Sequence, residues 1–111
     1  MKYVLLICDD ETASPSMEEI TADPAFKAYD DEVDRRGTSL AGARLRPVAE
    51  ARTVRVRDGE TLVSDGPFAE TKDFVGGVDI IECANLDEAL AIAARHPYAQ
   101  RGCVEVRPVW E

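Results

Sequence analysis

The chain of 111 residues is 45% hydrophobic and 32% charged, a composition typical of one globular domain, expected over residues 1–111. Its formal net charge of −9 argues against partners that need a basic face, namely nucleic acid and an anionic membrane surface. The apolar run Tyr3–Ile7 is too short for a signal peptide core or a membrane span, and 3 cysteines spaced unlike any metal motif favour a reduced, cytoplasmic protein.

The apolar run Lys2–Cys8 predicts a central strand. Asp9, Asp10 and Glu11 follow it as an acidic run, for which a solvated loop is favoured over a metal site because no histidine or spaced carboxylate accompanies it. Ser16 and the glutamate three residues later have the spacing of a capping box, which predicts a short helical turn.

A longer helix is expected to begin after Asp23, a good N-cap that is followed by Pro24, and to end at Gly37. Its apolar face is formed by Phe26, Tyr29 and Val33. Charged pairs at i,i+4 spacing indicate a solvated opposite face: Lys27–Asp31, Asp31–Arg35 and Glu32–Arg36.

Extended patterns fill the middle of the chain. Leu40–Val48 is expected to be extended, and Thr53–Arg57 and Thr61–Val63 read as a hairpin joined by the Asp58-Gly59 turn. Gly76-Gly77 is expected to form a flexible joint before a strand over Val78–Cys83.

A second helix and a last strand complete the chain. Asn85 and Glu88 predict a capping box at the start of that helix, and Pro97 stops it. Its apolar side comprises Leu86, Ala89, Leu90, Ala93 and Ala94. Cys103–Val109 alternates apolar and polar residues and predicts the last strand.

This order of elements predicts an α+β, ferredoxin-like antiparallel sheet with strand order 4-1-3-2 and two helices on one face. Cys8 and Cys103 should then lie on neighbouring strands, with Cys83 near the opposite end of the sheet. The valines and isoleucines of the other face, together with Trp110, would remain uncovered, which predicts a homodimer.

The loop Asp65–Asp73 reads DGPFAETKD and is the main candidate for function. Gly66 and Pro67 predict a rigid turn, and the bulky Phe68 is expected to be buried so that the loop folds against the body. A purely structural turn and a functional loop are about equally favoured. The ligand-binding candidates of the functional interpretation are Asp65, Gly66, Pro67, Phe68 and Lys72.

Catalytic candidates are few. Asp65, Glu70 and Lys72 could form a site in which a carboxylate near Lys72 has a shifted pKa; the alternative is that Asp65 caps its own turn and Glu70–Lys72 is a surface pair. The single histidine, His96, sits at the end of the second helix, where the helix dipole favours an imidazolium and a structural role is preferred over a catalytic one.

The motif, together with TVRVRDGETLVS at 53–64 and VEVRP at 104–108, resembles the DGPF (DGPFAETKE) branch of the YCII-related proteins across nearly the whole chain. The resemblance implies a dimeric α+β barrel and a regulatory association with extracytoplasmic-function sigma factors. No cofactor is expected. The sister YciI-like branch carries a His–Asp pair proposed as catalytic, but Phe26 stands near the position of that histidine.

Two functions remain open. A binding, accessory or regulatory module with a small-molecule ligand is favoured. The alternative is a cofactor-independent enzyme that acts on a small organic molecule in the cleft beside the DGPF loop.

Overall fold

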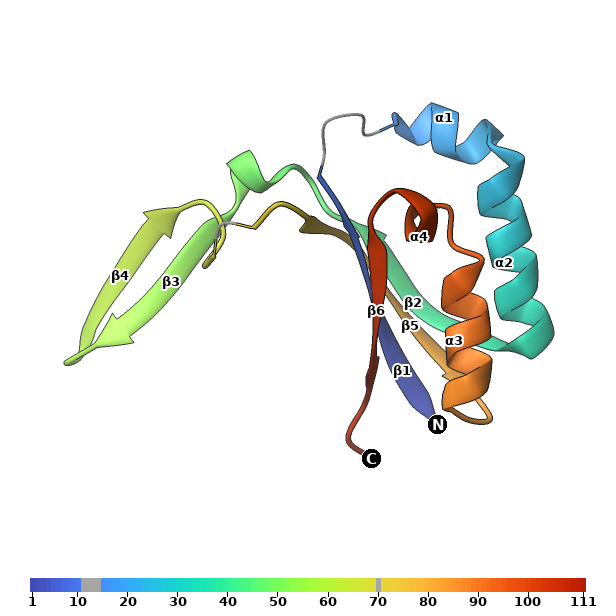
Figure 1. Cartoon of the computed structure of the whole chain (residues 1–111). Helices are drawn as coiled ribbons and strands as arrows, with labels where there is room; N and C mark the ends of the chain where they lie inside the picture. The colour runs from blue at the N-terminus through green and yellow to red at the C-terminus, as the bar shows by residue number, and fades with distance from the viewer. Residues whose placement is uncertain (11–14, 70) are drawn as a thin grey trace.

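Six strands and four helices make up the parts of the chain that the computed structural model describes, residues 1–10, 15–69 and 71–111. The strands are β1 Lys2–Asp9, β2 Gly37–Arg44, β3 Arg52–Arg57, β4 Glu60–Asp65, β5 Phe74–Cys83 and β6 Cys103–Pro108; the helices are α1 Met17–Ala22, α2 Pro24–Arg36, α3 Leu86–Ala94 and α4 Tyr98–Arg101, with a 3-10 turn over Val48–Glu50. Strands β2, β5, β1 and β6 form an antiparallel sheet in that order, and the helices lie on one side of it (Figure 1).

The alternation of side chains along β1 explains this layering. Tyr3, Leu5 and Ile7 point to the helices and are buried, whereas Val4 and Leu6 point to the other side and are half-buried. The core is completed by side chains from α2, β5 and α3: Tyr29, Val33, Ile81, Cys83, Ala89, Ile92 and Ala93. The expected α+β sheet with strand order 4-1-3-2 is confirmed and is compatible with a ferredoxin-like fold.

The starts of α1 and α2 were predicted correctly from the capping residues in the sequence. The Asp23 side chain accepts a hydrogen bond from the Ala25 amide, and Gly37 is the C-cap of α2. Ser16 and Glu19 form the expected capping box of α1. On α3, Ile92 replaces the expected Leu86 and Leu90 on the buried side, because the sheet contacts the helix along the line of Ala89, Ile92 and Ala93.

Two strand boundaries were wrong, and one short helix was not predicted. The strand expected over Leu40–Val48 begins at Gly37 and ends at Arg44, since it pairs with β5 from Gly37 onward. Gly76-Gly77 is not a joint but lies inside β5, where Gly77 pairs with Ile7 of β1 and Arg44 of β2 and Gly76 lies at the register shift between β1 and β5. Helix α4 begins directly after Pro97.

The cysteine prediction is confirmed. Cys8 and Cys103 occupy directly opposed positions on β1 and β6, and Cys83 lies at the far end of β5, where its amide donates to the carbonyl of Met1. Burial is the first of several effects that raise the pKa of the Cys8 thiol to about 11. All three cysteines are free.

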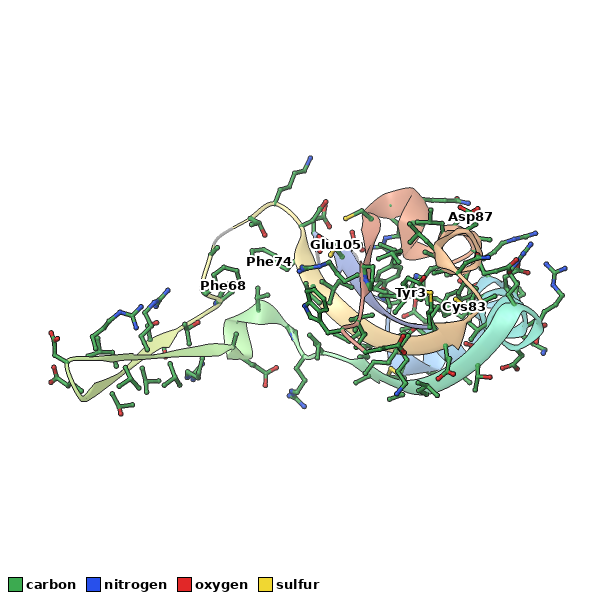
Figure 2. The ribbon with its side chains drawn as sticks, turned by 90° about the horizontal axis from the view of Figure 1, so that it is seen from below. Tyr3, Phe68, Phe74, Cys83, Asp87 and Glu105 are labelled. Carbon is green, nitrogen blue, oxygen red and sulfur yellow. The ribbon has the colours of Figure 1, made fainter. Side chains whose placement is uncertain are left out.

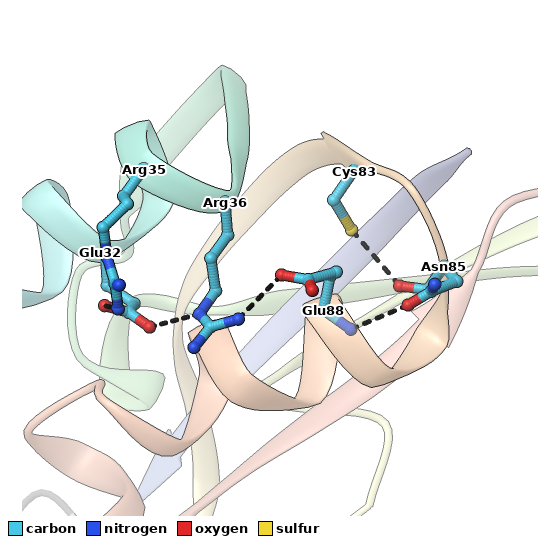
Figure 3. Close-up of polar contacts among 6 residues, drawn as sticks. All are labelled: Glu32, Arg35, Arg36, Cys83, Asn85 and Glu88. Atoms are coloured by element: carbon cyan, nitrogen blue, oxygen red, sulfur yellow. Dashed lines mark hydrogen bonds and ion pairs between the residues drawn. The ribbon is translucent and has the colours of Figure 1, made fainter.

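The charged face of α2 is not fully solvated as expected. Glu32 is buried, and its carboxylate accepts hydrogen bonds from both Arg35 and Arg36 (Figure 3). Arg36 also donates to Glu88 on α3 at 2.9 Å, so the Glu88 side chain serves this contact instead of closing a capping box with Asn85. The side chains of Glu32, Arg36 and Glu88 therefore join α2 to α3.

Strands β3 and β4 form a separate two-stranded sheet that projects away from the helices and from the four-stranded sheet (Figures 1 and 2). The predicted turn at Asp58-Gly59 is confirmed, with positive φ at both residues (52° and 76°). We call the segment from residue 45 to residue 68, which contains this hairpin, the arm.

Candidate functional site

A carboxylate and a phenol meet on the helix side of the sheet. Asp79 of β5 has the same orientation as Ile81 and Cys83, so its side chain points toward α2. There the Tyr29 hydroxyl donates a hydrogen bond of 2.6 Å to the Asp79 carboxylate. A short hydrogen bond to a half-buried carboxylate fixes the orientation of both groups.

His96 lies beside this pair. Its ring centroid is 4.6 Å from that of Tyr29, and the rings of Phe26 and Tyr98 also contact it edge-on, at 5.7 and 5.6 Å. Burial lowers the pKa of His96 to about 4, so the imidazole is neutral. The expectation of an imidazolium at the helix end is therefore wrong, because aromatic rings replace the water that a charge would need.

The tautomer of His96 follows from one hydrogen bond. Nδ1 accepts from the amide of Tyr98 at 3.1 Å, which leaves the ring proton on Nε2. His96 thus brings a neutral N–H donor to the site.

These side chains line a cavity of about 280 Å³, which we call the Tyr29–Asp79 pocket. Its walls come from β1, β2 and β5 and from α1, α2 and α4: Ile7, Met17, Ile20, Phe26, Tyr29, Asp30, Gly42, Ala43, Arg44, Gly76, Gly77, Asp79, His96 and Tyr98. The volume lies near the lower end of the range for small-molecule sites, roughly 300–1,000 Å³.

Gly42 of β2 leaves room beside the Asp79 carboxylate. It is paired with Asp79 across the sheet, and a Cβ on Gly42 would lie 2.6 Å from the Asp79 Oδ1 atom. Any larger residue would have to displace the carboxylate. A glycine here is therefore part of the geometry of the site.

Burial shifts the pKa values of three acidic groups in the pocket upward. Burial raises the pKa of Asp79, and the hydrogen bond from Tyr29 partly opposes that rise. Burial also raises the pKa of the neighbouring Asp30, with the Asp79 charge as the next cause. Burial and the Asp79 interaction both raise the pKa of Tyr29, so its hydroxyl stays protonated. A carboxylate with a raised pKa and a fixed donor can hold a polar ligand group or move a proton.

The DGPF loop is built differently from what the sequence predicted. Phe68 is 82% exposed, so the expectation that its ring is buried and packs the loop onto the body is wrong for the single chain (Figure 2). Gly66 does have a positive φ of 89°, and Asp65 pairs with Arg52 at 3.1 Å across the base of the hairpin. Asp65 thus has a structural partner in the arm.

The remaining residues of that loop are not brought together with the Tyr29–Asp79 pocket. Lys72 is exposed, Glu70 lies outside the described residues, and Pro67 and Phe68 line a separate open hollow of about 650 Å³ with the 45–51 segment. The ligand-binding role of Asp65, Gly66, Pro67, Phe68 and Lys72 stays a prediction. Of the catalytic candidates that the structure describes, His96 alone lines the Tyr29–Asp79 pocket.

The acidic run that begins at Asp9 is not wholly a solvated loop, because Asp9 is the last residue of β1. Asp9 is buried and forms an ion pair with Arg101, and its Oδ1 accepts from the Asp10 amide at 2.8 Å. Glu11 is outside the described residues. Among the residues that the structure describes, no group of three or more His, Cys, Asp or Glu side chains is arranged to hold a metal ion.

Sequence reasoning missed Asp79 and assigned Tyr29 to the core alone. One signal was present: Asp79 is a carboxylate within the apolar run Val78–Cys83, at the same alternation as Ile81. A charged residue at an inward-facing strand position requires a partner or a function.

Two comparisons relate this chain to known proteins. The model of the YCII-related domain matches residues 1–111. An uncharacterized protein of Rhizobium meliloti (strain 1021) is 51% identical over 69 residues, which is 60% of this chain and 56% of that protein. The chain thus aligns with about half the length of that relative. Among the described residues, no helix is long and apolar enough to cross a membrane.

Proposed function

The chain belongs to the YCII-related family, and we propose that it is a binding protein for a small organic molecule held in the Tyr29–Asp79 pocket. The observation that carries this proposal is the fixed Tyr29–Asp79 hydrogen bond at the wall of an open cavity. A half-buried carboxylate is costly to keep unless it is paired or used, and Gly42 leaves this one accessible.

The pocket selects its ligand by polarity and shape. Asp79 supplies an acceptor, the neutral His96 supplies a donor, and Phe26 and Tyr98 supply flat apolar walls. A compact, partly aromatic or unsaturated molecule with one donor and one acceptor fits this arrangement.

Catalysis is the second candidate, favoured by the raised pKa of Asp79. A carboxylate with a raised pKa is a better general base near neutral pH than an ordinary aspartate. In a cofactor-independent enzyme Asp79 would accept a proton from the bound molecule, and Tyr29 would hold the carboxylate in place. In this candidate function the reaction would take place in the Tyr29–Asp79 pocket, whereas the sequence suggested the cleft beside the DGPF loop.

Three further assignments belong to the proposal. The motif at 65–73 supports the DGPF branch of the family and, with it, a regulatory association with extracytoplasmic-function sigma factors. Free cysteines fit a cytoplasmic protein. A homodimer is supported by the sheet face that the helices leave open, on which Val4, Leu6, Val78 and Ile80 are only half-buried.

The binding proposal is tested with a fragment library on ¹⁵N-labelled protein. Fragments that bind should shift the amide signals of Gly42 and Gly77, and these shifts should be lost in Asp79→Asn. Asp31→Asn is the matched control, because Asp31 lies on the outside of the same helix as Tyr29 and pairs with Lys27 at 3.2 Å. Binding that is equally strong in Asp79→Asn, or that maps only to residues 45–51 and 67–69, would reject the proposed site.

A further inference from the structure

The sheet that floors the Tyr29–Asp79 pocket has charged side chains at two opposite corners and glycines at the other two. Asp79 of β5 pairs with Gly42 of β2, and two positions along both strands Gly77 pairs with Arg44. Because residues two apart on a strand point to the same face, all four positions face the helices. Diagonal neighbours of this kind, here Asp79 and Arg44, have Cα atoms about 7–8 Å apart. A small molecule that lies over the two glycines can therefore reach a carboxylate at one end and a guanidinium at the other.

Arg44 is fixed at the exposed side of the pocket by its backbone and its side chain. It ends β2, and directly after it the Leu45 amide donates to the Gly76 carbonyl at 2.9 Å. In the described part of the chain, the Arg44 guanidinium donates its hydrogen bond to the carbonyl of Pro15. A carbonyl is neutral, so this contact orients the guanidinium and leaves its positive charge for a ligand.

A second cavity of about 300 Å³ adjoins the pocket at this arginine. The residues that line both cavities are Met17, Arg44, Gly76 and Tyr98. The other charged side chains that line the second cavity pair with partners of opposite charge. Arg46 pairs with Glu50 at 2.9 Å, and Asp9 pairs with Arg101. Arg44, by contrast, brings a positive charge to the shared wall with a neutral hydrogen-bond partner.

Electrostatics determine which end of a ligand each side of the pocket takes. Burial raises the pKa of both Asp79 and Asp30, and a further negative charge beside these carboxylates is unfavourable. On the other side, burial raises the pKa of Tyr98, and the charges of Arg101 and Arg44 partly oppose that rise, so this hydroxyl lies in a positive field. An anionic group therefore belongs beside Arg44, and a hydrogen-bond donor belongs beside Asp79.

We propose that the ligand of the Tyr29–Asp79 pocket is a compact organic acid that places its carboxylate on Arg44 and a hydroxyl or amino group on Asp79. This inference rests on the proposed binding function and adds the chemical class of the ligand. The planar fork of an arginine matches the two oxygens of a carboxylate, and the rings of Phe26 and Tyr98 supply flat walls for the rest of the molecule. Because the chain as a whole carries a charge of −9, it does not attract anions in general, and selection of an acid depends on this local group.

The test is an NMR titration of ¹⁵N-labelled protein with meta- and para-hydroxybenzoate and with the two corresponding hydroxybenzamides. All four probes carry a flat ring and a hydroxyl, but only the acids are negatively charged at neutral pH. The acids should shift the amide signals of Gly42 and Gly77 and bind about tenfold or more tightly than the amides. In Arg44→Gln the acids should lose about tenfold or more in affinity, whereas the amides should bind as they do to the parent.

Arg46→Gln is the matched control. It removes the same charge from the wall of the second cavity, where Arg46 is paired with Glu50. The affinity for the acids should change by less than about threefold in this variant. Arg44 and Arg46 are both exposed, so both variants should keep the amide spectrum of the parent away from the substituted residue.

The contrary outcomes separate the acid site from the pocket itself. Amides that bind at Gly42 and Gly77 as tightly as the acids would reject the acid site and leave the pocket as a ligand site. Equal losses of acid binding in Arg44→Gln and Arg46→Gln would show a general effect of charge and reject Arg44 as the partner. If neither acid shifts Gly42 or Gly77 at millimolar concentration, the inference is overturned, and the fragment library decides independently whether the pocket binds a ligand.

Discussion

His96 has a neutral ring because three aromatic neighbours exclude water from it. Its pKa of about 4 lies below the value of about 6.5 expected in the unfolded chain. The unfolded chain therefore takes up a proton between pH 6.5 and 4 that the folded chain does not. The stability that this histidine contributes is present above pH 6.5 and is lost as the pH falls through that window, by up to about 3 kcal/mol.

The measurement is urea unfolding at several pH values between 7 and 4, for the parent and for His96→Gln. Asp30 and Asp79 have raised pKa values and act in the opposite direction, but they are common to both proteins and cancel in the comparison. The parent should lose more stability on acidification than His96→Gln. Equal slopes would show that His96 is protonated in the folded state.

The Tyr29 hydroxyl donates a hydrogen bond to the Asp79 carboxylate on the helix side of the sheet. Tyr29→Phe should lower the free energy of unfolding by about 1–2 kcal/mol, the usual loss when a hydrogen bond to a charged group is removed. It should also raise the pKa of Asp79 further, which ¹³C NMR of the carboxyl group measures. Tyr3→Phe is the control, because the Tyr3 hydroxyl donates only to the Met1 sulfur at 3.7 Å. An unchanged titration of Asp79 would contradict the pairing.

Residue-scale predictions from sequence failed where burial depends on distant neighbours. Asp79 is one of two acids in an otherwise apolar strand, and only the fold brings Tyr29 to it from fifty residues away. Phe68 was expected in the core from its size alone, but hydrophobicity says nothing about which surface covers a side chain. His96, a candidate from the sequence, lines the Tyr29–Asp79 pocket, but its expected positive charge was wrong because aromatic rings enclose the imidazole.

At the scale of elements, the contact between α2 and α3 depends on Arg36, which bridges Glu32 and Glu88. Glu32 is nearly buried, and hydrogen bonds from Arg35 and Arg36 lower its pKa to about 2. Arg36→Met should lower the Tm by several degrees, because it removes the bridge and leaves Glu32 with one partner.

Arg35→Met is the matched control for that prediction. Arg35 contacts the same carboxylate, but its side chain is 63% exposed against 31% for Arg36, and its ion pair with Glu32 lies within α2. Thermal unfolding of both variants should show the larger loss for Arg36→Met. An equal loss would mean that the bridge to Glu88 contributes nothing.

Helices and turns were predictable where the residues that determine them are close together in the sequence. Asp23-Pro24 fixes the start of α2, and Asp58-Gly59 fixes the hairpin turn, through backbone preferences that act within a few residues. The end of β2 and the position of Gly76-Gly77 inside β5 follow from cross-strand pairing, which no short window of sequence contains.

At the scale of the whole molecule, the proposed homodimer would cover several exposed apolar features. These features are the open sheet face, the exposed valines of β3 and β4, and Phe68, all of which are unfavourable in water. The half-covered sheet was foreseen from the order of elements, whereas the projecting arm was not, because a hairpin pattern does not say where the hairpin points.

The claim that the functional unit is a pair of chains is tested most directly by the mass of the unmodified protein in solution. Light scattering after size exclusion, at micromolar concentration, should give twice the chain mass of 12.2 kDa. A single species of 12.2 kDa that unfolds cooperatively would contradict the account, because it would show that the open sheet face and the arm are stable in water without a partner.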